Sequence, residues 1–318
     1  MMNRWPKAYR IEKLPAGFKT RMQDFVVTEQ LEFEPTGDGE HLFLSIEKCN
    51  VATPEVAQML AGRFAVPALD VSYAGMKDKR ALARQWFSVR GGRDDTLVPG
   101  ELAPGVRLLE LRRHRRKLKR GQIAHNQFAI KLRGSVDEAW TERLESLKCD
   151  GAPNYFGPQR FGWDNVERAC DWLPHRRSRR ISKFKQGLYL SVLRSFLFNE
   201  VLGARVGANS WRKPIVGEVM EQGQPTGPLW GRGRSAAQAR AREIEVSALA
   251  SHAQVCLGLE HAGLTQQRRS LVLQPQRMSW QKLADDELVV RFALPAGSYA
   301  TSLLGEVFEL ESPPHAQV

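Results

Sequence analysis

Alternation of apolar and polar side chains predicts a sheet-rich first half of the chain. Residues 24–30 (DFVVTEQ) and 41–47 (HLFLSIE) have strand-like composition and partial alternation, and GDGE at residues 37–40 predicts a turn between them. Strand side chains point alternately to the two faces of a sheet, so this pattern favours half-buried strands. The predicted strands cover residues 24–30, 41–47, 69–74, 85–90, 106–111, 123–133 and 287–294.

Helical signals become frequent only after about residue 150. Before that point, Thr53 followed by Pro54 and Glu55 predicts a helix start. Threonine can cap a helix, proline suits the first turn, and an acid is favourable at the positive end of the helix dipole. This helix is expected to end near Phe64. Further helices are predicted over residues 137–148, 186–204 and between 235 and 250, the second of them with a broad apolar face.

The order of these elements predicts an α+β protein with an insertion. Mixed strands and helices extend to about residue 150, mostly helical sequence covers residues 151–273, and strand character then returns. A domain inserted at 151–273, with the first domain completed by the C-terminal residues, would produce this order. Two consecutive domains divided near residue 150 fit nearly as well. The length of 318 residues agrees with two domains, each of roughly 150 residues.

Positive charge is concentrated in two runs. The chain has 47 Lys and Arg against 35 Asp and Glu, a net charge of +12. Residues 112–120 (RRHRRKLKR) and 176–185 (RRSRRISKFK) contain seven and six of the positive residues and no acid. Such a localised excess predicts a polyanionic partner, although solvated mobile loops would also explain it. The apolar residues within the runs, Leu118, Ile181 and Phe184, favour an ordered surface.

Several classes of protein lack their signatures here. The four cysteines form no C-x-x-C pair and no zinc-finger spacing, and they fit a reducing compartment. No P-loop, H-E-x-x-H or G-x-S-x-G motif occurs. The N-terminus is polar, and no apolar run approaches the roughly 18 residues of a membrane span. We therefore expect a cytoplasmic protein without a metal, a cofactor or a membrane partner.

The link between residues 69–74 and 85–90 has unusual local chemistry. In GMKDKRALARQWFS (residues 75–88), Asp78 stands between Lys77 and Lys79, and these cations favour the ionised carboxylate. A carboxylate at a strand end beside a basic surface could act on a polyanion as a nucleophile or a base. An aspartate that caps or solvates a turn would give the same pattern, and Asp is common in turns.

Two other segments combine aromatic and amide side chains. Asn126 and Phe128 share one face of the predicted strand at 123–133, where they could hydrogen-bond to and stack on a nucleobase, or form ordinary core. The segment NYFGPQRFG at residues 154–162 lies at the proposed domain junction and could be a hinge or a platform for RNA.

Taken together, these segments resemble the TruD family of tRNA pseudouridine synthases. The resemblance rests on residues 24–43, 75–88, 116–128, 153–162 and 294–304 (LPAGSYATSLL), which occur in the family's order. It implies an α+β catalytic domain with a mostly antiparallel sheet over residues 1–150 and 274–318, and an inserted α-rich domain over 151–273. The implied reaction is isomerisation of uridine to pseudouridine in tRNA, expected at uridine-13 and chiefly in glutamate tRNA, without a metal or cofactor.

The resemblance also implies roles for individual residues. Asp78 matches the essential aspartate, which could attack the base, attack the sugar or act as a base. Lys19 matches a lysine that would pair with this carboxylate, and Phe128 matches an aromatic residue that stacks on the target uracil. Asn126 matches the polar neighbour of that aromatic residue, and Tyr299 matches a second aromatic position. The cations expected to bind the RNA backbone are Arg112, Arg113, Arg115, Arg116, Lys117, Lys119 and Arg120.

The alternative is a non-catalytic RNA-binding or RNA-remodelling protein on the same fold. The aspartate and its matching lysine favour the enzyme, because simple binding needs no carboxylate that faces a polyanion. A duplex-DNA binder is disfavoured by the lack of a helix-turn-helix or zinc-finger signature. We expect a monomer, since a two-lobed RNA cleft needs no partner subunit. The chain departs from the family at Gly305-Glu306, where the family usually has Arg-Glu.

Overall fold

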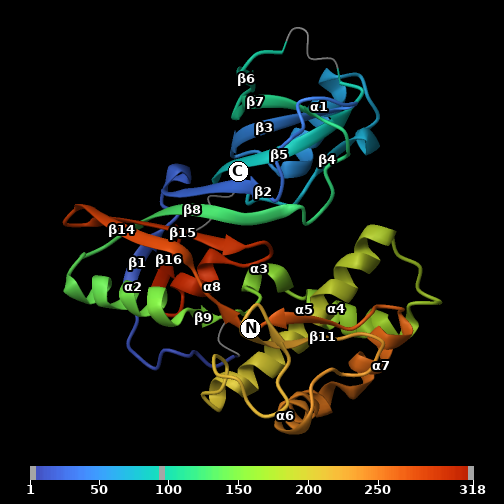
Figure 1. The fold of residues 1–318 in the computed structure, drawn as a ribbon, viewed down its shortest axis with the longest axis vertical. Helices are drawn as coiled ribbons and strands as arrows, with labels where there is room; N and C mark the ends of the chain where they lie inside the picture. Colours follow the sequence, from blue (N-terminus) through green and yellow to red (C-terminus); the bar gives the residue numbers. More distant parts are fainter. Residues whose placement is uncertain (1–4, 93–96, 314–318) are drawn as a thin grey trace. The chain divides into compact units, whose positions relative to one another are not determined.

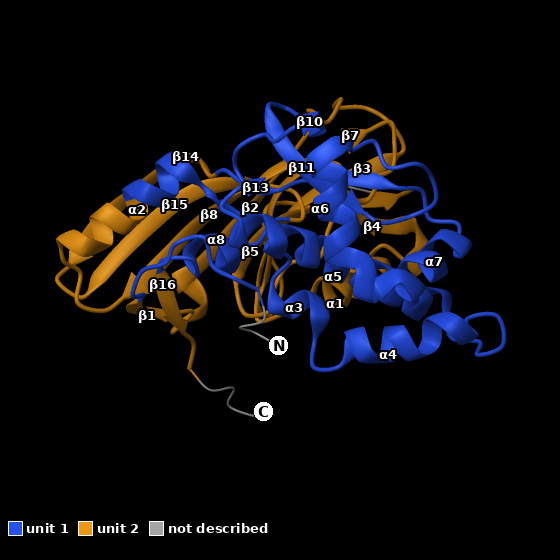
Figure 2. Cartoon of the chain, turned by 90° about the horizontal axis from the view of Figure 1, so that it is seen from below, with its two compact units in different colours: residues 1–13, 145–274, 298–307 blue, residues 14–144, 275–297, 308–318 orange. Residues whose placement is uncertain are grey.

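The computed structural model of this protein describes residues 5–92 and 97–313. The chain divides into two compact units, each assembled from segments that are distant in the sequence (Figure 2). Unit 2 comprises residues 14–144, 275–297 and 308–318, and unit 1 comprises residues 1–13, 145–274 and 298–307. The two ends of the predicted catalytic domain, residues 1–4 and 314–318, lie outside the described residues.

The central segment of unit 1, residues 145–274, nearly coincides with the predicted insertion at 151–273. Unit 1 also contains residues 1–13 and 298–307, which the sequence assigned to the catalytic domain. Hydrogen bonds tie these two segments into unit 1. The Tyr155 hydroxyl donates to the Pro6 carbonyl at 3.0 Å, and the Ala8 N–H donates to the Glu306 carboxylate at 2.9 Å. The boundaries of the inserted domain itself stay a prediction.

Unit 2 is built on one mostly antiparallel sheet (Figure 1). Among the described residues its main path is β14-β15-β8-β2-β5-β3-β7-β6, β1 joins β8 and β16, and β4 joins β5. Of the strand pairs that the structure describes in this sheet, only β1–β16 and β2–β5 are parallel. The strands are β1 (Leu14–Phe18), β2 (Phe25–Leu31), β3 (His41–Cys49), β4 (Val71–Tyr73), β5 (Leu82–Arg90), β6 (Gly100–Ala103), β7 (Val106–His114), β8 (Ile123–Arg133), β14 (Gln276–Ala284), β15 (Glu287–Pro295) and β16 (Phe308–Glu311). The predicted α+β class is confirmed.

Most of the predicted strands differ from the observed ones by one to three residues at an end, and β7 and β4 show why. β7 continues past residue 111 to His114, because its pairing with β3 extends that far and places Leu42 opposite Arg113. β4 is shorter than predicted, since residues Ala68–Asp70 form a 3₁₀ turn before it. Charged side chains on the outer face of a paired strand do not interrupt its backbone hydrogen bonds, so composition alone misplaced the end of β7.

Helix α1 (Thr53–Arg63) begins where the sequence predicted, but Thr53 does not cap it. The capping residue is Ala52, whose N–H donates to the Glu55 carboxylate at 3.0 Å. The Thr53 hydroxyl instead donates to Gln85 Oε1 at 2.8 Å and accepts the Lys77 N–H at 3.1 Å. α1 buries Val56 and Leu60 with the core residues of β3, β5 and β7: Leu42, Leu44, Ile46, Phe87, Val89, Val106 and Leu108. Thr53 thereby ties the helix start to the segment that carries Asp78.

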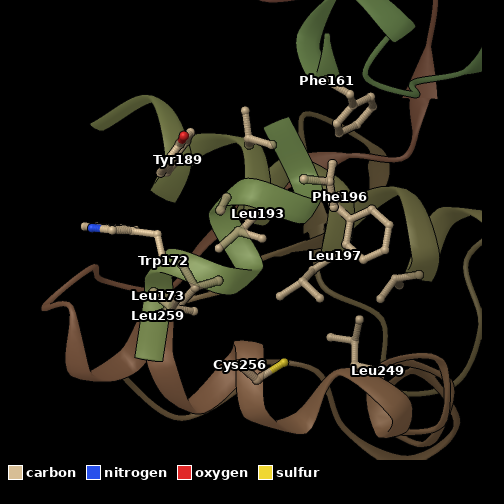
Figure 3. Close-up of a cluster of buried hydrophobic side chains, with 14 residues drawn as sticks. Phe161, Trp172, Leu173, Tyr189, Leu193, Phe196, Leu197, Leu249, Cys256 and Leu259 are labelled. Carbon is tan, nitrogen blue, oxygen red and sulfur yellow. The ribbon is translucent and has the colours of Figure 1, made fainter. Parts of the chain in front are cut away.

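Unit 1 is mostly helical around α5. Figure 3 shows Leu193, Phe196 and Leu197 of α5 in one buried cluster with Trp172 and Leu259. The helices are α3 (Pro158–Phe161), α4 (Asn165–Trp172), α5 (Lys183–Gly207), α6 (Ala239–Leu249), α7 (Ala253–His261) and α8 (Ala300–Leu304), while α2 (Glu138–Asp150) crosses the division between the units. The short strands are β9 (Ala152–Pro153), β10 (Met220–Glu221), β11 (Gln224–Leu229), β12 (Gln267–Ser270) and β13 (Val272–Leu273). The sequence predicted none of them: β9, β10 and β13 have two residues each, and β11 (QPTGPL) contains two prolines and a glycine and does not alternate.

Candidate active site

Asp78 lies in the link between β4 and β5, in unit 2. Its side chain is 43% exposed and forms an ion pair with the Lys19 ammonium through Oδ2. The Arg80 backbone N–H donates to the other carboxylate oxygen, Oδ1, at 3.1 Å. The carboxylate therefore has one cation and one backbone donor and remains open on its other sides, as a group that must reach a reactant requires.

Lys19 approaches Asp78 from the turn after β1. Its backbone has φ = 53°, a left-handed conformation that is uncommon for a residue with a side chain and often marks a functional constraint. The ammonium lies 4.1 Å from the centre of the Phe25 ring, within range of a cation–π interaction. Lys19 thus contacts the carboxylate and an aromatic ring at the same time.

Two buried lysines hold the backbone on either side of this carboxylate. Lys77 pairs with Glu29 of β2 at 2.7 Å, and their side chains are 7% and 0% exposed. The second Glu29 oxygen accepts the Trp86 N–H of β5 at 2.9 Å. The fully buried Lys48 of β3 donates to the Asp78 main-chain carbonyl at 2.8 Å. Burial lowers the pKa of the Lys48 ammonium from 10.5 to about 8, and the nearby Asp78 partly opposes this shift.

An aromatic wall stands next to the Lys19–Asp78 pair. Phe25 contacts Phe128 of β8 edge to face, with ring centres 5.9 Å apart, and Phe128 stacks on Phe292 of β15 at 5.4 Å. Strand register explains the arrangement, because Phe128 lies opposite Phe292 on one neighbouring strand and opposite Val27 on the other. Phe128 is 8% exposed, so its neighbours cover most of the ring.

Asn126 lies two residues before Phe128, on the same face of β8. Register places it opposite Glu29 of β2, the partner of Lys77. Asn126 is buried, and within the described residues its Oδ1 has no hydrogen-bond partner. A buried polar atom without a partner is costly, and one explanation of such an atom is a ligand that supplies the missing hydrogen.

Four of the predicted site residues therefore belong to one region of unit 2. Lys19 contacts Asp78 directly. Phe25 contacts both Lys19 and Phe128 and so connects them. Asn126 lies opposite Glu29, whose partner Lys77 directly precedes Asp78. The arrangement combines an ionised acid, an aromatic wall and a hydrogen-bond acceptor. Such a set suits a flat polar ring that must be held next to a nucleophile or base.

Sequence reasoning missed Phe25, Glu29 and Lys48. The first two carry a detectable signal, because Phe25, Val27 and Glu29 occupy alternate positions of DFVVTEQ and an acid interrupts an otherwise apolar face. Lys48 carries no comparable signal. Lysine is almost always exposed, and only the tertiary structure shows that this one is enclosed.

Tyr299 belongs to unit 1, where it is the residue before α8. Its ring lies 6.5 Å from that of Phe156. Phe156 also stands 4.1 Å from the guanidinium of Arg269, which donates to Asn154 Oδ1 at 2.6 Å. Burial lowers the pKa of Arg269 to about 10. The NYFGPQRFG segment thus contributes buried side chains to unit 1 around these aromatic and cationic groups.

The predicted RNA-backbone residues lie at the end of β7 and in the loop that follows it. Two of these cations already have acidic partners: Arg112 pairs with Glu110 at 2.6 Å and Arg115 with Asp38 at 2.8 Å. Lys117 donates to the Leu69 carbonyl at 2.6 Å, and Arg120 stands 5.6 Å from the Tyr73 ring centre. The positions of all seven are as follows: Arg112 and Arg113 lie in β7, and Arg115, Arg116, Lys117, Lys119 and Arg120 lie in the loop.

Gly305, which stands where the family usually has arginine, directly follows α8 in unit 1. The Lys13 ammonium donates to its carbonyl at 2.6 Å. The adjacent Glu306 is fully buried and pairs with Lys7 at 3.1 Å.

In the part of the chain that the structure describes, no group of three or more His, Cys, Asp or Glu side chains could hold a metal ion. Over the same residues, no helix has both the length and the apolar character that a membrane crossing needs.

Comparisons with known proteins agree with one another. The family model described as tRNA pseudouridine synthase D (TruD) matches residues 9–169 and 220–307. A protein named tRNA pseudouridine synthase D from Cellvibrio japonicus is 40% identical over 317 residues, covering 97% of this chain and 94% of its own. One of the same name from Chromohalobacter salexigens is 38% identical and covers 96% of each chain. A solved structure assigned to tRNA pseudouridine synthase D from Methanosarcina mazei has a TM-score of 0.67 at 18% identity, covers 96% of both chains and shows the shared fold.

Proposed function

This chain belongs to the TruD family of tRNA pseudouridine synthases, and from that membership we propose that Asp78 is the catalytic carboxylate for isomerisation of uridine-13 in tRNA, chiefly glutamate tRNA. In this reaction the bond from C1′ to N1 of uracil breaks, the base turns, and a bond from C1′ to C5 forms. N1 gains a proton and C5 loses one, so no electrons or atoms enter or leave. The enzyme is an isomerase.

The observation that carries the proposal is the Lys19–Asp78 ion pair beside Phe25. The ammonium holds the carboxylate in an ion pair, at a place where the carboxylate could take any of the three possible roles of Asp78. Lys48 and the Glu29–Lys77 pair hold the backbone of the link, so the carboxylate has a defined place before the substrate arrives. Preorganised charge of this kind costs little reorganisation during the reaction.

The remaining predicted residues would bind the flipped nucleotide and the RNA around it. The ring of Phe128 would stack on the target uracil, and Asn126 would be its polar neighbour on the same face of β8. Tyr299 would provide a second aromatic contact. The cations of residues 112–120 would bind phosphates and provide affinity without base specificity. We propose that the protein acts as a cytoplasmic monomer.

A modification assay on unmodified tRNA transcripts tests the proposal. Pseudouridine is mapped by position for the wild type, for Asp78→Asn and for Asp285→Asn. Asp285 is a matched control, because it also pairs with a lysine, Lys282, at 2.9 Å, but at the hairpin between β14 and β15. We expect product at uridine-13 with the wild type and with Asp285→Asn. We expect none with Asp78→Asn, although that variant still binds tRNA.

Two results would contradict the proposal. Product from Asp78→Asn at the wild-type rate would show that Asp78 is not the catalytic carboxylate. Binding without product from the wild type, across a panel of tRNAs, would favour the non-catalytic RNA-binding protein. A product at another position of the transcript would keep the catalytic assignment and correct the substrate site.

A further inference from the structure

A groove of about 630 Å³ opens in unit 2 beside the predicted RNA-backbone loop. Its walls come from α1, from the 3₁₀ turn Ala68–Asp70, from β4 and from residues 117–120. The lining residues do not include Asp78, Lys19 or Phe128, so the groove is separate from the candidate active site. Its volume falls within the range of about 300–1,000 Å³ that is typical of small-ligand sites.

The groove has apolar surface that the fold leaves uncovered. Leu69 lines the groove and is 82% exposed. Tyr73 backs the same groove, with its ring packed edge to face on Phe87 at 5.9 Å. An exposed aliphatic side chain next to a fixed aromatic ring is a surface on which a nucleobase can pack, because every base has a flat π-face.

The rim of the groove is cationic. Lys117, Lys119 and Arg120 line it, and none of the described residues that line it is acidic. The loop that carries them is anchored within its basic stretch and directly after it. The N–H of the buried Leu118 donates to Ser88 Oγ at 3.1 Å, and the Gly121 N–H donates to the Ala74 carbonyl at 2.8 Å. Lys117 spans the groove to the Leu69 carbonyl, so the two walls are held together before any ligand binds.

We propose that this groove binds one unpaired nucleotide of the RNA substrate, other than the target uridine. Its base would pack on Leu69 and Tyr73, and its phosphate would lie against Lys119 and Arg120. The inference rests on the proposed function only in taking RNA as the substrate. Folded RNA offers splayed-out bases in loops and bulges, and a shaped groove with a cationic rim accepts such a base together with its phosphate.

Binding of a tRNA transcript as a function of salt tests the groove. The dissociation constant is measured for the wild type, Leu69→Ala, Lys119→Ala and the control Leu283→Ala. Leu283 is 48% exposed and lies on β14, at the opposite end of the sheet path from β6. Because Leu69→Ala removes apolar surface that the base would cover, we expect it to weaken binding about fivefold. The dependence on salt should not change, because this variant removes no charge.

Lys119→Ala should behave differently. Loss of one phosphate contact should lower the slope of log K against log salt by about 0.7–0.9. Leu283→Ala should change neither quantity. Chemical probing of the bound transcript adds a direct readout, in which one unpaired base besides the target is protected by the wild type and becomes reactive again with Leu69→Glu. Thermal unfolding serves as the control for folding of the Leu69 variants. We expect them to fold, because this side chain is exposed.

The outcomes separate this inference from the proposed function. If Leu69→Ala binds tRNA as tightly as the wild type, no base occupies the groove and the proposal is wrong, even if Lys119→Ala changes the salt slope. Unchanged tRNA binding by Leu69→Ala is also the result expected if the groove binds a protein or a small molecule instead of a base. If the wild type binds tRNA but makes no pseudouridine, the proposed function fails. The groove is then still supported if Leu69→Ala weakens binding.

Discussion

Lys77 and Lys79 flank Asp78 in the sequence, yet the structure predicts very different consequences for removing them. Lys77→Met removes an ammonium that pairs with Glu29 at 2.7 Å, where the two side chains are 7% and 0% exposed. Lys79→Met removes an ammonium that lies 3.6 Å from the Glu55 carboxylate, and these two side chains are both about half exposed. The two variants change the same residue type, one position on either side of the proposed catalytic carboxylate, and so form a matched pair.

The expected magnitudes follow from burial. Without Lys77, the Glu29 carboxylate stays buried and keeps its hydrogen bond from the Trp86 N–H, and breaking a buried ion pair in this way costs about 3–5 kcal/mol. Lys79 and Glu55 are exposed to solvent, so Lys79→Met should change stability by at most about 1 kcal/mol. A double variant, Glu29→Leu with Lys77→Met, removes both charges of this buried pair. We expect it to be more stable than Lys77→Met alone.

Urea unfolding followed by tryptophan fluorescence measures these differences, with Trp86 as a reporter that lies next to the pair. The m-value must stay constant for midpoints to be compared as stabilities. Lys77→Met should also lower kcat more than it raises KM, since it displaces Asp78 without removing a substrate contact. Equal midpoints for Lys77→Met and Lys79→Met would refute the reasoning. So would a double variant less stable than either of its single variants.

Three other perturbations have defined outcomes. The pKa of buried Lys48 is lowered from 10.5 to about 8, so between these pH values the unfolded chain holds a proton that the folded chain lacks. The free energy of unfolding of the wild type should therefore increase as the pH rises from about 8 to 10.5. The urea midpoint of Lys48→Met should not show this increase. Phe128→Ala removes a buried ring and should destabilise the protein by about 3–5 kcal/mol in the same assay, and Phe128→Leu should destabilise it less. Arg116→Glu should weaken tRNA binding more than Arg115→Ala does, since Arg115 is already paired with Asp38. Equal dissociation constants for the two variants across a salt titration would contradict this.

Elements with strong local signals were predicted with nearly correct bounds. Strand β8 coincides with its predicted range of 123–133, because its buried side chains include Asn126, Phe128 and Ile130 at alternate positions. α5 was expected at 186–204 and extends to Lys183–Gly207, with Ser182 Oγ accepting the Lys185 N–H at its start. Periodicity identifies such elements because each of them buries one face along its whole length.

Other features depend on contacts that no local pattern encodes. Thr53 was expected to cap α1, and the structure instead turns its hydroxyl to Gln85 and to the Lys77 N–H. Residues 5–13 pack into unit 1, although the chain then continues directly into β1 of unit 2. In both cases the partner lies far away in the sequence, and the choice between partners is made by packing.

The sequence by itself determined the family, the α+β class and the position of Asp78, because ordered motifs and strand periodicity are properties of the linear chain. Only the tertiary structure decided that Lys19 reaches that carboxylate across 59 positions, and that Glu29 and Lys48 are buried beneath the link. It likewise formed the groove at Leu69 from segments on both sides of β5 in the sequence. The physical reason is that burial and proximity depend on how strands pair, and strand pairing joins residues whose separation along the chain carries no signal.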